Sequence, residues 1–285
     1  MPSLIDIRRR IRSVKNTQQI TKAMKMVSAA KLRRAQDRVI ASRPYGALLR
    51  KVLANVAAAA SADESLADPL LARREEKRIL LALVTSDKGL AGAFNSNLIK
   101  GAQRFVSEHA QVEVSLVLIG RKGRDFFRKR GARIVSEHLG LAAKVKYDDL
   151  AQIARAAMEA YRKEEIDAVY VIYNEFKSVV AQRLTVTRVL PMEMPENETP
   201  EDYIFEQPAH KMLAELLPRY VEMEIYRAQL ESAAAEHAAR MTAMDAATSN
   251  AGEMIDKLTL YMNRVRQASI TKEIIEVVSG ASAAE

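Results

Sequence analysis

The stretch of sequence that decides the fold is residues 220–269, which read YVEMEIYRAQLESAAAEHAARMTAMDAATSNAGEMIDKLTLYMNRVRQAS. One heptad frame runs through it without a slip, and 11 of its 15 seam positions are apolar or Ala. This spacing predicts one long helix with a narrow seam for a partner helix. The seam positions are Tyr220, Met223, Arg227, Leu230, Ala234, His237, Met241, Met244, Thr248, Ala251, Ile255, Leu258, Met262, Val265 and Ser269.

The length of this helix sets a second expectation. No proline lies between Arg219 and Glu285, so the helix can extend for roughly 100 Å at about 1.5 Å per residue. A compact chain of 285 residues has a radius of gyration of only about 19 Å. We therefore expect the helix to project from the rest of the chain, as a mechanical or assembly element rather than an active site.

A second apolar stripe near the other end of the sequence offers the partner. Ser3 followed by Asp6 predicts a capping box at its start, and we expect Pro44 to kink or interrupt the helix. An antiparallel pair within the chain follows, formed by residues 1–60 and 208–285. The stripe comprises Leu4, Ile7, Ile11 and Val14, then Ile20, Met24 and Val27, and finally Leu48, Leu49, Val52, Leu53 and Val56.

Composition excludes several classes of protein. The chain has no cysteine, so it has neither disulfides nor a thiolate nucleophile, and its four histidines show no metal-ligand spacing. No apolar run reaches the roughly 18 residues that a membrane span needs, and the basic start lacks the apolar segment of a signal peptide. We expect a soluble protein of a reducing compartment, without direct membrane insertion.

Charge is distributed unevenly along the chain. Residues 1–40 carry 11 basic side chains against two acidic ones, whereas the whole chain has a net charge of only +8. Solvated helices normally mix the two signs and gain pairs four residues apart. An unbalanced face of this kind favours an anionic partner, which could be nucleic acid, lipid head groups or an acidic protein surface.

The middle of the chain has the pattern of an α/β domain. Buried strands alternate with helices, which predicts βαβ units and a mostly parallel sheet over residues 73–190, with one added edge strand. The expected strands are 79–86, 112–120 and 168–174, with 182–190 at the edge, and the expected helices are 93–108, 122–129 and 148–163. We expect a small Rossmann-like domain inserted between the two halves of a coiled coil.

The turn after the first strand, Thr85 to Gly92, raises an enzyme hypothesis, because such turns bind phosphates in α/β proteins. However, the chain contains neither G-x-x-x-x-G-K-[ST] nor G-x-G-x-x-G. Gly89 and Gly92 by themselves suit a tight turn and close helix packing. We therefore assign no catalytic, nucleotide-binding or metal-binding residue and expect no cofactor.

Four blocks of sequence resemble the gamma subunit of F-type ATP synthases. They are Ile7 to Thr17 running into Ile20 to Val27, then Thr85 to Leu90 with Phe94 and Asn95, then Glu236 to Met244, and finally Ile270 to Glu273 with Glu276 and Ser279 to Ala281. The blocks span the chain in the family's order, and the last is the most specific. One departure is Ala91, where several relatives carry cysteine.

The resemblance implies the central rotor shaft of the synthase, which couples proton-driven rotation of a membrane ring to catalytic sites elsewhere in the complex. It implies four partners: the alpha and beta subunits of the catalytic ring, a small epsilon-type rotor subunit and the ring of membrane c subunits. It also implies a peripheral location on the cytoplasmic face of a bacterial inner membrane, or on the matrix face in an organelle.

The resemblance also suggests contact residues. The expected catalytic-ring contacts are Arg9, Lys22, Met24, Lys25, Lys88, Ala91, Arg240, Gln267, Thr271 and Glu273. The expected contacts with the membrane ring and the epsilon-type subunit are Tyr203, Ile204, Phe205 and Glu206.

Two other classes of protein stay open on the residues themselves. A basic coiled-coil nucleic-acid-binding protein would explain Arg8 to Lys15, although these cations are interleaved with Ile7, Ile11 and Val14 rather than preceding a zipper. A nucleotide-dependent enzyme built on the α/β domain is the other. Retained DNA affinity in an assembled complex would favour the first, and nucleotide binding by the isolated chain would favour the second.

Overall fold

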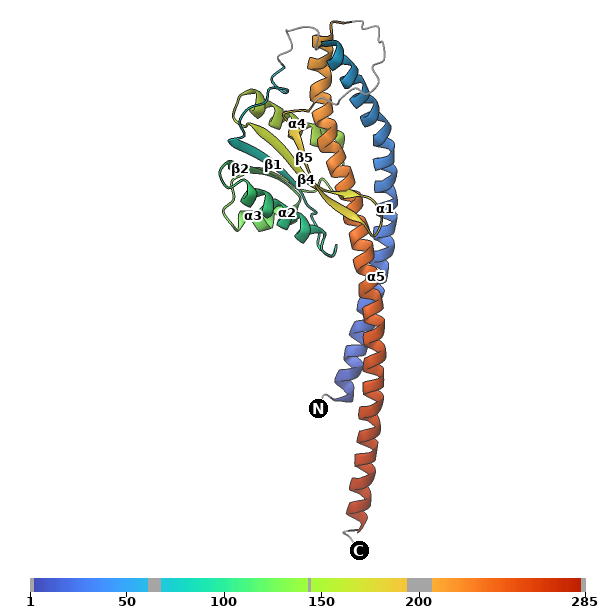
Figure 1. Ribbon diagram of the computed structural model, residues 1–285. Coiled ribbons are helices and arrows are strands. Elements are labelled where there is room, and N and C mark those ends of the chain that lie inside the picture. Colours follow the sequence, from blue (N-terminus) through green and yellow to red (C-terminus); the bar gives the residue numbers. More distant parts are fainter. Residues whose placement is uncertain (1–2, 61–67, 143–144, 194–206, 283–285) are drawn as a thin grey trace. The chain divides into compact units, whose positions relative to one another are not determined.

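The computed structural model describes residues 3–60, 68–142, 145–193 and 207–282 (Figure 1). The chain divides into two compact units. The first, called the tip unit, combines Met1–Ser28 with Arg240–Glu285, and the second, called the body, is Ala29–Ala239. Two long helices run through both: α1, Leu4–Ala60, and α5, Ala209–Ser282. The domain boundaries expected from the sequence, 1–60, 73–190 and 208–285, stay a prediction.

Helix α1 begins with the expected capping box. The Ser3 hydroxyl accepts the Asp6 backbone N–H at 3.2 Å, and an Asp6 carboxylate oxygen accepts the Ser3 backbone N–H at 3.3 Å. Pro44 does not end the helix, which continues to Ala60. Likewise, α5 begins nine residues before Pro218 and contains that proline. The expected interruption at Pro44 is therefore wrong.

In the tip unit, α1 and α5 pair along one seam. Thr21 and Thr248 share a hydrogen bond of 2.7 Å, and Gln18 donates to the Thr248 carbonyl at 3.4 Å. Because Thr21 is buried in this polar layer, Ile20 and Val27 face away from α5 and are exposed. The expectation that Ile20 and Val27 belong to the seam is wrong, since small polar residues continue the stripe there. On α5, every seam position from Met241 to Ser269 is at least partly buried.

The body contains a five-stranded sheet in the order β3-β2-β1-β4-β5. Strands β1 (Arg78–Val84), β2 (Glu113–Ile119), β3 (Ile134–His138) and β4 (Ala168–Phe176) are parallel. Strand β5 (Gln182–Leu190) pairs antiparallel with β4 at the edge. The connecting helices are α2 (Phe94–Glu108), α3 (Arg121–Arg128) and α4 (Tyr147–Arg162). The expected α/β class with one added edge strand is confirmed, and only β3 was missed.

The two faces of the sheet bury two apolar clusters. Helices α2 and α3 cover one face, where Phe94, Leu98 and Phe127 pack against alternate residues of β1, β2 and β4. Helix α4 and parts of α1 and α5 cover the other face (Figure 1). Side chains that alternate along β4 therefore enter both cores, which is why this strand reads as a continuous apolar run.

Within the body, α5 is buried on more than one side. Residues 228–236 are all buried, including Gln229, Glu231 and Glu236. By contrast the expected seam residues Tyr220, Met223 and Arg227 are only partly buried. The single narrow seam expected over residues 220–239 is therefore wrong, because the helix packs on the sheet as well as on α1.

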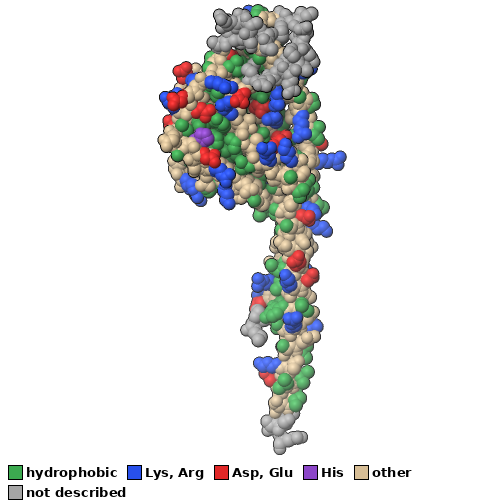
Figure 2. Space-filling model, viewed as in Figure 1, with side chains coloured by type: hydrophobic (Ala, Val, Ile, Leu, Met, Phe, Trp, Pro, Cys, Tyr) green, Lys and Arg blue, Asp and Glu red, His purple; other side chains and the backbone are tan. Residues whose placement is uncertain are grey.

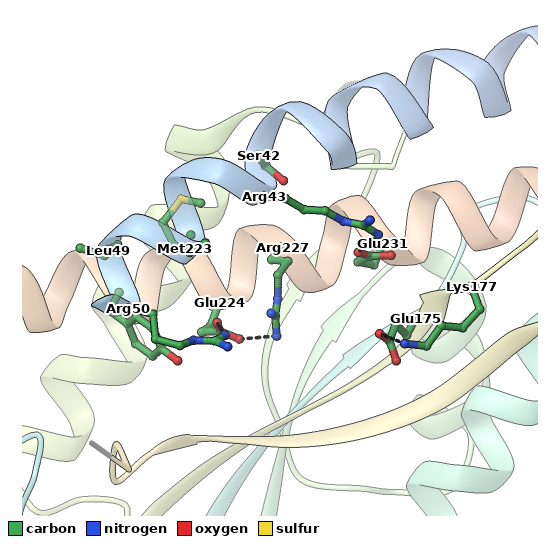
Figure 3. Close-up of a pocket in the computed structure, with 13 residues that line it drawn as sticks. Ser42, Arg43, Leu49, Arg50, Glu175, Lys177, Met223, Glu224, Arg227 and Glu231 are labelled. Carbon is green, nitrogen blue, oxygen red and sulfur yellow. Dashed lines mark hydrogen bonds and ion pairs between the residues drawn. The ribbon is translucent and has the colours of Figure 1, made fainter. Parts of the chain in front are cut away.

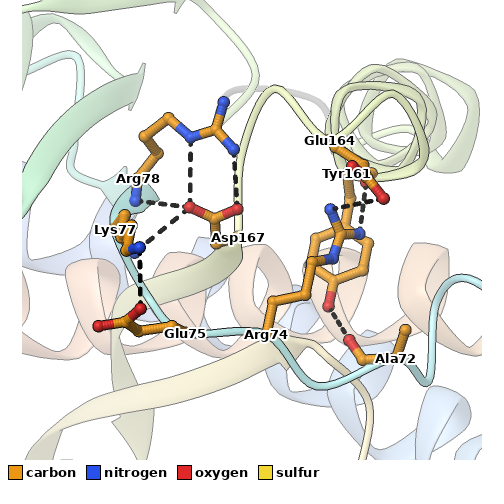
Figure 4. A network of polar contacts seen from close by, with 8 residues as sticks. All are labelled: Ala72, Arg74, Glu75, Lys77, Arg78, Tyr161, Glu164 and Asp167. Carbon is orange, nitrogen blue, oxygen red and sulfur yellow. Dashed lines mark hydrogen bonds and ion pairs between the residues drawn. The ribbon is translucent and has the colours of Figure 1, made fainter.

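A polar network ties the start of β1 to the start of β4 (Figure 4). Asp167, which is 4% exposed, accepts both the Nε and the Nη2 of Arg78, at 3.2 and 2.9 Å. It also accepts the backbone N–H groups of Lys77 and Arg78. Burial alone would raise the pKa of Asp167, but these hydrogen bonds and the Arg78 charge hold it below the usual aspartate range.

We expect Asp167→Asn to lower the free energy of unfolding by about 2 to 3 kcal/mol at pH 7, because a buried acceptor of charged hydrogen bonds is lost. A depressed carboxyl pKa contributes stability above the pKa of the unfolded chain and loses it as pH falls through the folded pKa. The difference between parent and variant should thus shrink below about pH 4. Urea unfolding at several pH values measures it, and a difference that is constant with pH would contradict this account.

Candidate functional site

The turn between β1 and α2 lies at the point where the strand order reverses, the position at which α/β proteins bind ligands. Its polar groups are already used by the chain. Ser86 donates its backbone N–H and its hydroxyl to the Asn95 side-chain oxygen, both at 3.0 Å. The two oxygens of Asp87 accept the backbone N–H groups of Arg121 and Gly140, both at 3.1 Å.

Several residues of the block Thr85 to Leu90 have structural roles in the body. Thr85 accepts the Gly123 N–H at 2.9 Å and so joins β1 to α3. Leu90 and Gly92 take positive φ values of 62° and 53°, which lets the chain turn tightly into α2. These contacts account for the residue types found in this turn without a bound phosphate.

Two carboxylates of α5 connect this helix to the α/β elements of the body. Glu222 accepts the Tyr147 hydroxyl at 2.6 Å and the Arg155 Nε at 2.7 Å, both from α4. Glu231 accepts the backbone N–H of Phe176, at the end of β4, at 3.1 Å. Burial and the hydrogen bond to Glu222 raise the pKa of Tyr147 well above its usual value. A turn of α5 about its axis would break these bonds, so within the body the helix and the sheet are held together.

The cations of α1 face away from its seam. Ten of the 11 basic residues among positions 1–40 are exposed, and within the part of the chain that the structure describes none of these ten forms an ion pair. The eleventh, Lys25, is partly buried and binds Asp245 of α5 at 2.6 Å. The chain therefore presents most of this positive charge to its surroundings.

The end of α5 exposes apolar side chains on several sides. Ile270, Ile274, Ile275, Val277 and Val278 are between 48% and 71% exposed. All described side chains from residue 270 to residue 279 are exposed. Apolar side chains are visible at the surface of this stretch in the space-filling view (Figure 2). A helix that is apolar on several sides is normally buried by a partner.

The structure places the other expected contact residues in different environments. Lys88, Gln267, Thr271 and Glu273 are exposed, whereas Ala91 is 2% exposed in the apolar core under α2. Any contact at Ala91 would therefore involve the backbone. Arg240 is also buried, at 8% exposed. Arg9 and Lys22 are exposed, and Met24 is partly buried. Tyr203, Ile204, Phe205 and Glu206 lie outside the described residues.

Sequence reasoning missed the linking carboxylates and the polar layer at Thr21. Glu222 and Glu231 fall outside the seam frame, where charged residues usually face solvent, so their burial depends on contacts distant in sequence. The heptad frame places Thr248 on the seam. A polar residue at a seam position indicates a polar layer, and in coiled coils such a layer sets the register of the two helices. In the described ranges there is no cluster of metal-ligating side chains and no helix apolar enough to cross a membrane.

The fold class is defined by two long antiparallel helices, one at each end of the sequence. Between them the sequence inserts an α/β domain with helices on both faces of its sheet. The ATP synthase family model matches residues 3–284. The ATP synthase gamma chain of Solibacter usitatus is 76% identical over the full length of both chains. That of Pelotomaculum thermopropionicum is 51% identical, again over 100% of each.

Solved structures share the fold. A chain of the Euglena gracilis mitochondrial ATP synthase rotor superimposes with a TM-score of 0.68 at 20% identity, covering 94% of this chain and 98% of that one. A chain of the Tetrahymena thermophila mitochondrial ATP synthase central stalk and c-ring gives a TM-score of 0.61 at 24% identity, covering 80% and 99%. The chain belongs to the ATP synthase gamma chain family, a non-catalytic subunit of a rotary ATPase.

Proposed function

We propose that this chain is the central shaft that turns inside the catalytic ring and transmits torque between that ring and a membrane ring. The observation that carries the proposal is the exposed end of α5, together with the outward cations of α1. An apolar helix end needs a surrounding sleeve, and a cationic face needs acidic neighbours. Both needs are met if the tip unit lies inside a ring of alpha and beta subunits.

Coupling in this proposal depends on contacts that differ with angle. A rod can bias the subunits around it only through interactions that are stronger in one state than in another. The exposed side chains of the tip unit differ in character between its two helices. Helix α1 exposes cations, whereas α5 exposes Met254, Leu260 and Tyr261. Each surrounding subunit would therefore meet a different surface at any moment.

The remaining partners and the location are part of the same proposal. We assign the membrane c subunits and an epsilon-type subunit to residues near 203–206, and the complex to the cytoplasmic face of a bacterial inner membrane. The resemblance supports this assignment, and one of the similar solved structures is of a mitochondrial central stalk together with a c-ring. No comparison favours nucleic acid as the partner.

Co-purification tests the proposal. An affinity tag on this chain should recover an ATP-hydrolysing hexamer of two subunit types together with a small rotor subunit. Recovery of the chain alone from cells that contain an active synthase would contradict the proposal. Recovery with DNA in place of these subunits would support the nucleic-acid alternative.

The cationic face gives a graded prediction. Exposed ion pairs contribute only about 0 to 1 kcal/mol each, so contacts between this face and acidic loops can be broken and remade at each step. Replacing Arg9, Lys22 and Lys25 together with Gln should change ATP turnover or coupling by less than about tenfold while assembly survives. Loss of Lys25 also removes the pair with Asp245.

A matched variant separates local from overall charge. Lys100, Arg104 and Lys129 are exposed on the α/β elements, and replacing these three with Gln removes the same net charge. Turnover and proton pumping should then equal those of the parent complex. If both triple variants behave alike, the α1 cations have no specific contact with the ring.

A further inference from the structure

A cleft in the body separates α1, α5 and the β4–β5 hairpin (Figure 3). Its volume is about 410 Å³. Residues from all three elements line it, among them Ser42 and Gly46 of α1, Met223 of α5 and Glu175 of β4. We call it the α1–hairpin cleft. The chain's own side chains leave this space open between segments of α1 and α5 that would otherwise pack together.

Small residues on α1 create the space. Ser42 and Gly46 continue the seam spacing from the buried Val39 to the buried Leu49. A Cβ atom on Gly46 would meet nothing within 4 Å, and the φ angle of Gly46 does not lie in the left-handed region. Glycine is unfavourable inside a helix. Within the described chain, neither close packing nor backbone conformation requires glycine at position 46. A side chain of another protein that enters this space would require it.

The charges of the cleft are layered. Its carboxylates lie inside, with Glu231 8% and Glu224 12% exposed, and its cations face outward, with Arg43 60% and Arg50 50% exposed. The distances from Arg43 to Glu231 and from Arg50 to Glu224 are 3.6 and 3.7 Å, longer than good hydrogen bonds. Lys177 of the hairpin, 55% exposed, also lies at the rim, where it pairs with Glu175 at 2.6 Å. The two arginines at the mouth of the cleft therefore retain capacity for another acceptor.

We propose that the α1–hairpin cleft binds an acidic segment of a partner protein, whose carboxylates pair with Arg43 and Arg50. An apolar neighbour in that segment fills the space beside Gly46 and against Leu49 and Met223. A small inorganic anion fits less well, because the inner lining sets Glu224 and Glu231 against one cation, Arg227, which binds Glu224 at 2.8 Å, and the remaining negative charge would repel a dianion. The site lies outside the tip unit and does not depend on whether the chain rotates.

A zero-length crosslink tests the proposal in the purified synthase. Carbodiimide joins an amine to a carboxylate only when the two are in ion-pair contact. The variant Arg43→Lys keeps the charge and introduces an amine at the rim. It should give an interprotein product in which mass spectrometry finds an Asp or Glu of another subunit joined at position 43. The variant Arg104→Lys, at an exposed position of α2 that does not line the cleft, should give no product with that Asp or Glu.

Filling the space provides the decisive comparison. Adding Gly46→Leu to Arg43→Lys should lower the yield of this product at least about fivefold. In the isolated chain Gly46→Leu should raise the Tm, because leucine is a better helix former. Unfolding therefore cannot account for the loss. Adding Ala41→Leu, a change at an exposed position of α1, should leave the yield unchanged.

Three results would overturn the proposal. The first is the absence of any interprotein product at position 43 in an assembled, active complex. The second is a product whose yield Gly46→Leu does not change. The third is binding of inorganic phosphate to the isolated chain that Gly46→Leu abolishes while no interprotein product forms, which would assign the cleft to a small anion.

Discussion

Gly120→Ala should lower the free energy of unfolding of the body severely. Gly120 follows β2 with a φ of +95°, where a side chain is strained. A Cβ atom at this position would lie 2.1 Å from the Thr85 carbonyl oxygen and 2.7 Å from the carbonyl carbon. Since these are backbone atoms at the end of β1, only movement of the strand itself could relieve the clash. We expect a loss of more than about 4 kcal/mol, an exceptional value for one substitution.

The measurement is urea unfolding of the isolated chain followed by circular dichroism. Gly131→Ala is the matched control, because Gly131 also has a positive φ, +65°, but a Cβ there would meet nothing within 4 Å. It should cost only the backbone strain, about 1 to 2 kcal/mol. Equal losses for the two variants would mean that the packing between β1 and β2 at this point is looser than described.

Ile274→Asp should lower the affinity of the chain for the catalytic ring at least about tenfold. Burying an isoleucine contributes about 1.5 to 3 kcal/mol, and a charge placed in an apolar sleeve adds a desolvation penalty. Each 1.4 kcal/mol is about a tenfold change in the binding constant. Titration of the chain into the isolated hexamer, followed by recovered ATPase activity, measures the affinity.

The isolated chain separates this effect from folding. Ile274 is 58% exposed, so Ile274→Asp should change the free energy of unfolding of the free chain by no more than about 0.5 kcal/mol. Ile274→Leu keeps the apolar character and should bind like the parent. Normal assembly of the Asp variant would mean that the end of α5 remains in solvent within the complex.

The elements of the fold were predictable where the periodicity is long or the strand is buried on both faces. The bounds of β5 agree with the prediction, and those of β1, β2 and β4 differ from it by no more than two residues. Strand β3 was missed because it has five residues and lies at the sheet edge, where Val135 is exposed between two partly buried neighbours. A strand this short gives too few alternations to distinguish it from a loop.

The side chains that connect the elements were harder to predict. Helical periodicity reports one apolar face, and α5 has several partners in the body, so charged residues such as Glu222 and Glu231 are buried against elements far away in sequence. In the tip unit the seam passes through Thr21, while the larger Ile20 faces outward. Choosing the most hydrophobic residues as seam positions therefore gives the wrong seam residue at this point of α1.

The most direct test of the shaft account is observation of a single complex. The chain contains no cysteine, so Ser96→Cys, at an exposed position of α2, gives one attachment point for a bead on this subunit while the catalytic ring is fixed to a surface. On addition of ATP the bead should rotate continuously in one direction, at a rate that follows the rate of hydrolysis. Sustained ATP hydrolysis with a stationary bead would contradict the account.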